Sequence, residues 1–220
     1  MLHHYKLKNG FTLAEVLITL GIIGVVAALT IPTLIGNYQK KEVAVRLQKM
    51  YNTLWGAISQ AELENGPSEF WIFEDSNQSI EFYNNNIRSH MNCVKIINRK
   101  CYLTDGSVIE LSNYTWDGLL AIVFYPFGNQ VNNKKYTRYR FGYNVWLAPK
   151  PSINWRLTKP KTEVTHMAAI ANELTRDRLL NGPGINNAPN EYCKSPYTGI
   201  VSCFQLIKRD GWEIKDDYPW

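Results

Sequence analysis

The stretch GFTLAEVLITLGIIGVVAALTIPTLI, residues 10–35, decides the fold, because its only charged residue is Glu15. From Val16 to Ile35, twenty consecutive residues carry no charge. A helix rises about 1.5 Å per residue, so a segment of this length reaches roughly 30 Å, the thickness of the hydrocarbon core of a bilayer. Helices in soluble cores rarely lack a polar face over such a length. The stretch therefore predicts a membrane-spanning helix.

The helical pattern continues beyond the apolar stretch. Six apolar residues recur at steps of three and four and so share one helix face: Val43, Leu47, Met50, Leu54, Ile58 and Ala61. We expect the helix to end near Asn65-Gly66-Pro67, because Gly favours the left-handed cap and Pro cannot continue a helix. The pattern predicts one long helix, apolar all round in its first half and amphipathic in its second. Pro32 should kink it, because proline removes a backbone hydrogen bond.

After Gly66 the pattern changes to β-strands and turns. The sequence predicts a hairpin over residues 101–111 around Asp105-Gly106, a buried strand over 119–125 and a partner strand over 136–147. A helix is expected over 165–180, closed by Asn181-Gly182-Pro183. In the tail we expect one or two helical turns, a stop at Gly211 and a short terminal strand. The expected fold class is α+β, with the long N-terminal helix packed on an antiparallel sheet.

Four segments follow from these patterns. Residues 1–10 form a polar leader, 11–36 a transmembrane or filament-core helix, 37–66 an amphipathic stalk helix and 67–220 an α+β head. The boundary of the head is placed at the Gly66-Pro67 break, because no other linker or low-complexity stretch separates stalk and head.

Composition supports a packed head and gives little support for a nucleic-acid partner. Of the 220 residues, 45% are hydrophobic and 20% charged, which is typical of a globular core. The net charge is +5, but without Lys6 and Lys8 of the leader 22 basic and 19 acidic residues remain, a balance of +3. That charge is too small to indicate a nucleic-acid partner by itself.

The four cysteines form two local pairs, Cys93 with Cys101 and Cys193 with Cys203. Neither spacing is usual for a zinc site, and in an exported protein the default interpretation is two disulfides. Metal binding and free thiols remain as alternatives, and four cysteines allow three connectivities. We favour Cys93–Cys101 and Cys193–Cys203, because short loops close easily.

Gly10 and Glu15 need a physical explanation. Gly10 is a small residue where the polar leader meets the apolar stretch, and Glu15 lies five residues further on. A carboxylate inside the bilayer costs about 2.5–3.5 kcal/mol on insertion scales, so it is usually functional or paired. If the chain were cut after Gly10, the new amine at Phe11 of a neighbouring, axially shifted subunit could pair with Glu15. Such pairing would neutralise both charges and set the axial register.

At these residues the chain resembles a known family. Gly10 followed by Phe11-Thr12-Leu13-Ala14-Glu15, a short basic leader and an apolar helix resembles the processing and methylation motif of type IV pilins and type II secretion pseudopilins. Pro32 is similar to the helix-bending proline of many such pilins. The tail, with a cysteine pair and Asp210-Gly211-Trp212, also resembles the end of many prepilin-type proteins.

The resemblance implies the processing, the partners and the location. A prepilin peptidase would cleave between Gly10 and Phe11, and Phe11 would be N-methylated. The partners would be other pilin or pseudopilin subunits, the inner-membrane assembly platform and membrane lipid, and no nucleic acid is expected. The chain would span the bacterial inner membrane once, with its head outside the cytoplasm, before entering an extracellular or periplasmic filament. We expect no cofactor: pseudopilins often hold calcium near the end of the head, but the spacing of Asp210, Asp216 and Asp217 defines no such site.

Two other interpretations of the N-terminus explain less of its sequence. A secretory signal peptide cut after Ala27-Ala28 would have an unusually long apolar region interrupted by Glu15. A plain signal anchor explains the span but not the sequence around Gly10. Lys40 and Lys41 follow the span on its external side, so positive charge does not determine orientation, which rests on the motif.

Two other functions remain open for the head. It could be a minor pilin that captures DNA or adheres to a surface, and the basic-aromatic run at residues 134–140 would then contact single-stranded DNA. It could also be an exported domain on a pilin-like anchor. No enzyme is expected, because the chain has no HExxH, phosphate-binding glycine loop or GxSxG motif.

Overall fold

The computed structural model describes residues 10–112, 119–128, 140–146, 174–182, 192–195 and 200–220. The chain divides into two units, Met1–Lys40 and Lys41–Trp220. Each unit is described by itself.

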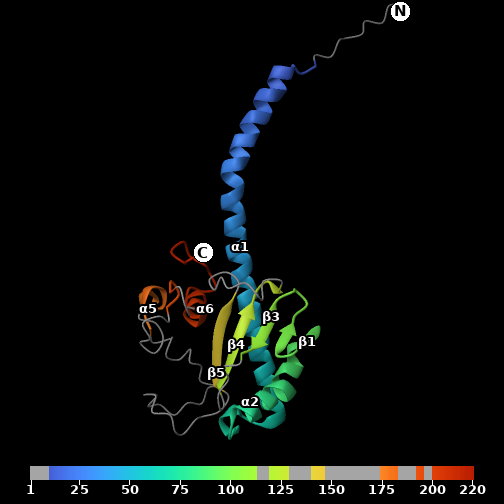
Figure 1. Cartoon of the computed structure of the whole chain (residues 1–220), viewed down its shortest axis with the longest axis vertical. Helices are drawn as coiled ribbons and strands as arrows, with labels where there is room; N and C mark the ends of the chain where they lie inside the picture. Colours follow the sequence, from blue (N-terminus) through green and yellow to red (C-terminus); the bar gives the residue numbers. More distant parts are fainter. Residues whose placement is uncertain (1–9, 113–118, 129–139, 147–173, 183–191, 196–199) are drawn as a thin grey trace, which may run out of the picture. The chain divides into compact units, whose positions relative to one another are not determined.

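Helix α1, Leu13–Asn65, is a single element of 53 residues (Figure 1). The long helix predicted from the apolar stretch and the amphipathic stripe is thus confirmed. It continues without interruption through Pro32, and the kink expected there stays a prediction. Gly66 follows the helix with φ +80°, the left-handed conformation that glycine adopts without steric cost.

A five-stranded antiparallel sheet follows, in the order β1-β2-β3-β4-β5 (Figure 1). Its strands are β1 Lys95–Ile97, β2 Lys100–Tyr102, β3 Val108–Leu111, β4 Leu119–Tyr125 and β5 Phe141–Trp146. Strands β2 and β3 form the predicted hairpin around Asp105-Gly106, with Gly106 at φ +79°. The α+β prediction is confirmed. Of the predicted partner strand, residues 136–139 and 147 lie outside the described part of the chain.

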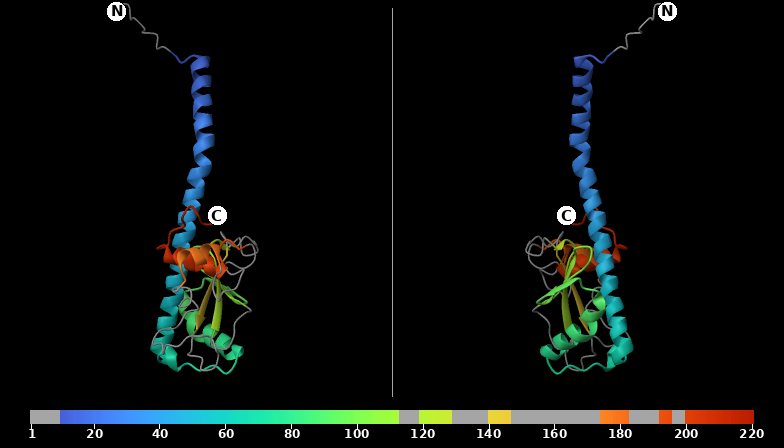
Figure 2. Two further views of the ribbon diagram at one scale, coloured as in Figure 1. Left: turned by 90° about the vertical axis from the view of Figure 1, so that its left-hand side faces the viewer. Right: turned by 90° about the vertical axis from the view of Figure 1, so that its right-hand side faces the viewer.

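The core of the second unit lies between α1 and one face of the sheet, and Figure 2 shows this part of α1 alongside the strands. All six residues of the predicted apolar stripe are buried. In β4, Leu120, Ile122 and Phe124 join this core, whereas Val123 and Tyr125 belong to a small cluster of their own. This alternation is what a strand between two layers requires.

Helix α6, Ile200–Arg209, completes this core. Its Phe204 is fully buried, and the centroid of its ring lies 4.9 Å from that of Tyr143 in β5. A Cβ atom at Gly142 would come within 2.9 Å of side-chain atoms of Val201 and Ile200. Gly142 therefore permits the close approach of α6 to the sheet.

Two disulfides join the cysteines in the pairs that the short loops favour, Cys93–Cys101 and Cys193–Cys203. The first connects the segment before β1 to β2, and the second connects a turn to α6. Cys101 and Cys203 are fully buried. The disulfides thus attach two short peripheral segments to the core.

The change from helix to strands and turns predicted directly after Gly66 is wrong for residues 68–91. This region contains the 3-10 helix η1 Ser68–Phe70, the α-helix α2 Ser76–Phe82, the π-helical turn η2 Tyr83–Ile87 and the 3-10 helix η3 Arg88–Met91. Asp75 caps α2 by accepting a hydrogen bond from the Gln78 amide at 2.9 Å. Tyr83, Ile87 and Met91 are buried at steps of four, a helical period that overrides weak local propensity.

The C-terminal third also differs from expectation. Helix α5 spans Arg176–Asn181 and overlaps the end of the predicted helix over 165–180; Thr175 is its N-cap and accepts a hydrogen bond from the Arg178 amide. Residues 165–173 lie outside the described part of the chain. Helix α6 is longer than the predicted one or two turns, and it ends before Gly211 at φ +74°. The predicted terminal strand is wrong, since residues 214–220 form turns and extended chain outside the sheet.

Candidate functional site

The site of interest is the start of α1, where the predicted processing and assembly residues lie. Gly10, Phe11 and Thr12 precede the helix and are exposed. A Cβ atom at Gly10 would meet no atom within 4 Å among the described residues. The Gly10–Phe11 peptide therefore lies in exposed, non-helical chain.

Thr12 and Glu15 form a reciprocal cap at the first turn of α1. The Thr12 amide and the Thr12 hydroxyl donate to Glu15 Oε2 at 2.8 and 2.7 Å, and the Glu15 amide donates to Thr12 Oγ1 at 3.3 Å. This arrangement is a capping box, which satisfies amide donors that have no partner inside the helix. From the sequence, Glu15 was predicted only to pair with a cation and not to cap its own helix. The Thr-x-x-Glu spacing before an apolar run is the sequence signal for this cap.

The rest of the first unit offers an apolar surface on every side. The large side chains from Leu13 to Ile35 are exposed, with Leu13, Leu29 and Leu34 each at least 70% accessible. The most apolar window of α1 has a mean hydropathy of 2.3, and none of it is buried. By length and composition, α1 is able to cross a membrane. An apolar surface of this extent requires lipid or other apolar helices as its surroundings.

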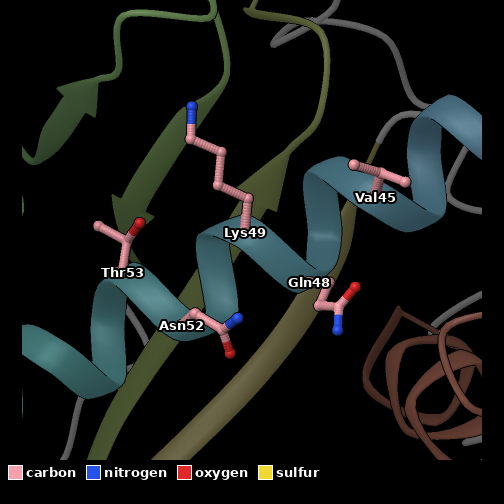
Figure 3. A pocket seen from close by; sticks show the side chains of 5 residues that line it. All are labelled: Val45, Gln48, Lys49, Asn52 and Thr53. Atoms are coloured by element: carbon pink, nitrogen blue, oxygen red, sulfur yellow. The ribbon is translucent and has the colours of Figure 1, made fainter.

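Within the head, the outward face of α1 is polar and hollowed only slightly. Figure 3 shows a shallow pocket lined by five side chains of this one helix: Val45, Gln48, Lys49, Asn52 and Thr53. The amine of Lys49 donates to Asp105 Oδ2 at 2.8 Å. Partial burial raises the pKa of Asp105, but hydrogen bonds from Lys49 and Ser107 outweigh it and lower that pKa to about 2. The Lys49 amine therefore holds the β2–β3 turn against α1.

The acidic residues of the tail are held by an arginine. Arg176 contacts both Asp210 and Asp217, with its Nε 2.9 Å from both oxygens of Asp210 and its terminal nitrogens 2.6 and 2.7 Å from those of Asp217. Hydrogen bonds from Arg176 lower the pKa of the Asp217 carboxyl below its usual value. These bonds connect α5 to the segment after α6. Of the three acidic residues weighed for calcium, two are thus bonded to Arg176.

Metal-ligating side chains do not cluster in the described ranges. Within them, no group of three or more His, Cys, Asp or Glu side chains could hold a metal ion. The basic-aromatic run at residues 134–140 lies outside the described part of the chain, apart from Arg140.

The N-terminal part of the chain matches a known sequence motif. A family model described as the prokaryotic N-terminal methylation motif matches residues 5–31, which include Gly10, Phe11 and Glu15. The chain is therefore a type IV pilin-like, prepilin-type protein, as the resemblance indicated. This motif is structural and does not define an enzyme family. The long apolar helix of the chain fits a pilin-like membrane anchor.

The remainder of the chain matches a second family. No curated protein and no solved structure matches the chain. A family model described as Family of unknown function (DUF6613) matches residues 33–220, which is most of the chain. The chain therefore belongs to the Family of unknown function (DUF6613), and it carries a prepilin-type methylation motif at its N-terminus.

Proposed function

We propose that the chain is a structural subunit of a type IV pilus or a type II secretion pseudopilus. In this proposal it is cleaved after Gly10, N-methylated at Phe11 and assembled through its N-terminal helix. The observation that carries the proposal is the exposed apolar surface from Leu13 to Ile35, most of which lies within the methylation motif matched at residues 5–31. Such a surface suits a bilayer before assembly and the packed helical core of a filament afterwards.

The capping box supports a second role for Glu15. Both bonds from Thr12 use Oε2 of Glu15, and Oε1 accepts no hydrogen bond from the residues that the structure describes. The carboxylate is therefore able to cap its own helix and to accept a further donor. In the proposed filament that donor is the methylated amine of Phe11 in a neighbouring subunit, which neutralises Glu15 in apolar surroundings.

The segments have distinct tasks in this proposal. Residues 1–10 are removed by the prepilin peptidase, 11–36 hold the subunit in the inner membrane and then line the filament core, 37–66 form the stalk and 67–220 form the exposed head. The head lies outside the cytoplasm, where two disulfides are chemically favoured. Subunits of the same filament and the inner-membrane assembly platform are the partners.

Mass spectrometry of the N-terminus of the membrane-bound protein tests this proposal, with prepilin peptidase present and absent. We expect a chain that starts at methylated Phe11 only when the peptidase is present. Glu15→Gln should be cleaved as well, but should fail to assemble if the charge of Glu15 is needed. An uncut chain, or one cleaved beyond Ala28, would overturn the proposal and indicate an anchored or a secreted domain.

A further inference from the structure

Charge is strongly segregated along the part of the chain between α1 and β2. Residues 50–87 contain six acidic residues and neither lysine nor arginine. Residues 88–104 contain four lysines and arginines and no acid. Charges of opposite sign are usually mixed on a protein surface, so this separation creates two surfaces of opposite potential on one head.

The first surface, called here the acidic segment, consists of Leu63, Glu64, Phe70, Ile72 and Glu74. All five are exposed, and the exposed fractions of the three apolar residues are 79%, 70% and 85%. The segment combines large apolar side chains with carboxylates and is typical of a binding surface rather than of a solvated loop.

This segment is held in place by Trp71, which is 6% exposed. The indole of Trp71 donates to the Gly66 carbonyl at 3.0 Å, and its ring lies 4.5 Å from that of Phe82. The Ser68 amide donates to Glu62 Oε1 at 3.2 Å. Because Trp71 is directed inward, its neighbours in the chain, Phe70 and Ile72, are left exposed. Little ordering is therefore needed when a partner binds.

The second surface, called here the basic edge, consists of Val94, Lys95, Ile96 and Ile97 on and beside β1. All four are exposed. Strand β1 is the first in the sheet order, so within the described sheet it has a neighbouring strand on one side only. An exposed edge with apolar side chains favours association with another chain. The Cys93–Cys101 disulfide and a 3.3 Å bond from Arg88 to the Asn98 carbonyl hold this edge in place.

Charge decides how these two surfaces pair. Two basic edges brought together would place Lys95 and the nearby Arg88 against their counterparts, and two acidic segments would repel each other in the same way. Pairing of an acidic segment with a basic edge joins opposite charges and covers apolar residues on both sides. Because the two surfaces differ, this contact is heterologous, and a heterologous contact that does not close into a ring produces an open filament.

We propose that the acidic segment of one copy binds the basic edge of the next copy, as a lateral contact between heads. This inference rests on the proposed filament function and adds the surface through which heads recognise each other. The apolar residues supply most of the contact, while Glu64 and Glu74 facing Lys95 select the orientation.

Thiol cross-linking of the full-length chain, expressed with its peptidase and assembly machinery, tests this contact. No cysteine of the native chain is free, so Ile72→Cys and Ile96→Cys introduce the only thiols. The double variant should form a ladder of cross-linked dimers, trimers and higher multimers, and each single variant should stay monomeric. Dimers of Ile96→Cys alone would overturn the proposal in favour of pairing between like edges.

The N-terminus of the same sample separates the two levels of the proposal. A chain that begins at methylated Phe11 but forms no ladder refutes the head contact and leaves the filament function standing. An unprocessed chain refutes the filament function, and the head contact falls with it.

Charge reversal in the same double-cysteine background tests the electrostatic part. Lys95→Glu should lower the cross-linked yield by roughly fivefold, as expected when an exposed attractive charge contact becomes repulsive. Adding Glu74→Lys should restore the yield. Lys194→Glu, at an exposed lysine outside the basic edge, is the matched control and should leave the ladder unchanged. A yield insensitive to Lys95→Glu would contradict the proposed orientation.

Discussion

The two halves of α1 show how one helix can be stabilised in two ways. From Leu13 to Ile35 the large apolar side chains are exposed. The side-chain hydrogen bonds described there are local to the helix: the Thr12–Glu15 cap, and bonds from the Thr19 and Thr30 hydroxyls to carbonyls of the preceding turn. From Val43 to Ala61 one stripe is fully buried against the sheet and α6. The first half depends on local hydrogen bonds and on its surroundings, whereas the second half depends on tertiary packing.

This difference predicts which residues of α1 the head requires. Burying a leucine side chain contributes about 1.5–3 kcal/mol, and the second half of α1 buries Leu47 and Leu54 completely. The leucines of the first half are 60–79% exposed. The same leucine substitution should therefore destabilise the head when it is made in the second half and leave head stability unchanged when it is made in the first half.

The largest expected effect comes from leucine truncation. Leu54→Ala should lower the free energy of unfolding of the head by about 2–5 kcal/mol, because it removes buried contacts and leaves a cavity. Leu29→Ala, at a position that is 73% exposed, should leave head unfolding within about 0.5 kcal/mol of wild type. Thermal unfolding of the detergent-solubilised chain, followed by near-UV circular dichroism, measures both. Equal losses would show that the two halves are not independent.

Removing a disulfide should have a somewhat smaller effect, and only on the head. Each disulfide closes a short loop, with sequence separations of 8 and 10 residues, so the chain-entropy argument gives about 2.5–3 kcal/mol for each. The pair Cys93→Ser with Cys101→Ser and the pair Cys193→Ser with Cys203→Ser should both lower the midpoint of chemical unfolding. Hydrogen exchange in residues 13–35 should not change. Faster exchange there would contradict the separation of the two units.

Arg176→Gln should destabilise the head by about 1–2 kcal/mol, because Asp210 loses its main cation while Lys215 remains. The folded-state pKa of Asp217 is lowered, so this carboxylate stabilises the fold above its unfolded pKa of about 3.9. That contribution is lost as pH falls through the lower, folded-state pKa.

Unfolding measured from pH 7 to pH 2 checks this prediction. The difference between wild type and Arg176→Gln should be full at neutral pH and should shrink below about pH 4. Lys41→Gln, at an exposed lysine that does not contribute to the pKa shift of Asp217, serves as the control. A difference that is independent of pH would mean that packing, rather than charge, accounts for the loss.

The smallest expected effect is confined to the first turn of α1. Thr12→Ala removes the cap and should destabilise the helix start by about 1 kcal/mol. Amide exchange at residues 13–16 should become faster, while head unfolding stays unchanged. Thr12→Ser keeps the hydroxyl and serves as the control. A change in head stability would contradict the local character of this cap.

The sequence was most informative where one physical constraint dominates. Twenty uncharged residues and the apolar stripe predicted α1, and Asp105-Gly106 predicted the β2–β3 hairpin. Prediction failed at residues 68–91, where polar asparagines and glutamates hide a helical period whose buried members are Tyr83, Ile87 and Met91. It also failed in the tail, where Trp212 adopts φ +63°, a conformation that local propensity does not favour.

The same contrast applies to the candidate functional residues: some could be predicted from the sequence, and the contacts of others are known only from the structure. Gly10, Phe11 and Glu15 were identified from sequence, because a small residue and a lone carboxylate beside an apolar span stand out against their surroundings. The capping box also has a local sequence signal, the Thr-x-x-Glu spacing, but only a cation partner was predicted for Glu15. The contacts of Arg176 with Asp210 and Asp217 join residues far apart in the chain, and no local pattern indicates them.

A long apolar helix able to cross a membrane, the methylation motif and the core-facing side of α1 could all be predicted from the sequence. These properties depend on length, charge and periodicity, which are local and need no knowledge of distant residues. The inward position of Trp71, which leaves Phe70 and Ile72 exposed, and the place of β1 at the edge of the described sheet became known only from the packed structure. Burial and strand order depend on contacts between distant segments, because the free energy of a packed core is shared among all its members.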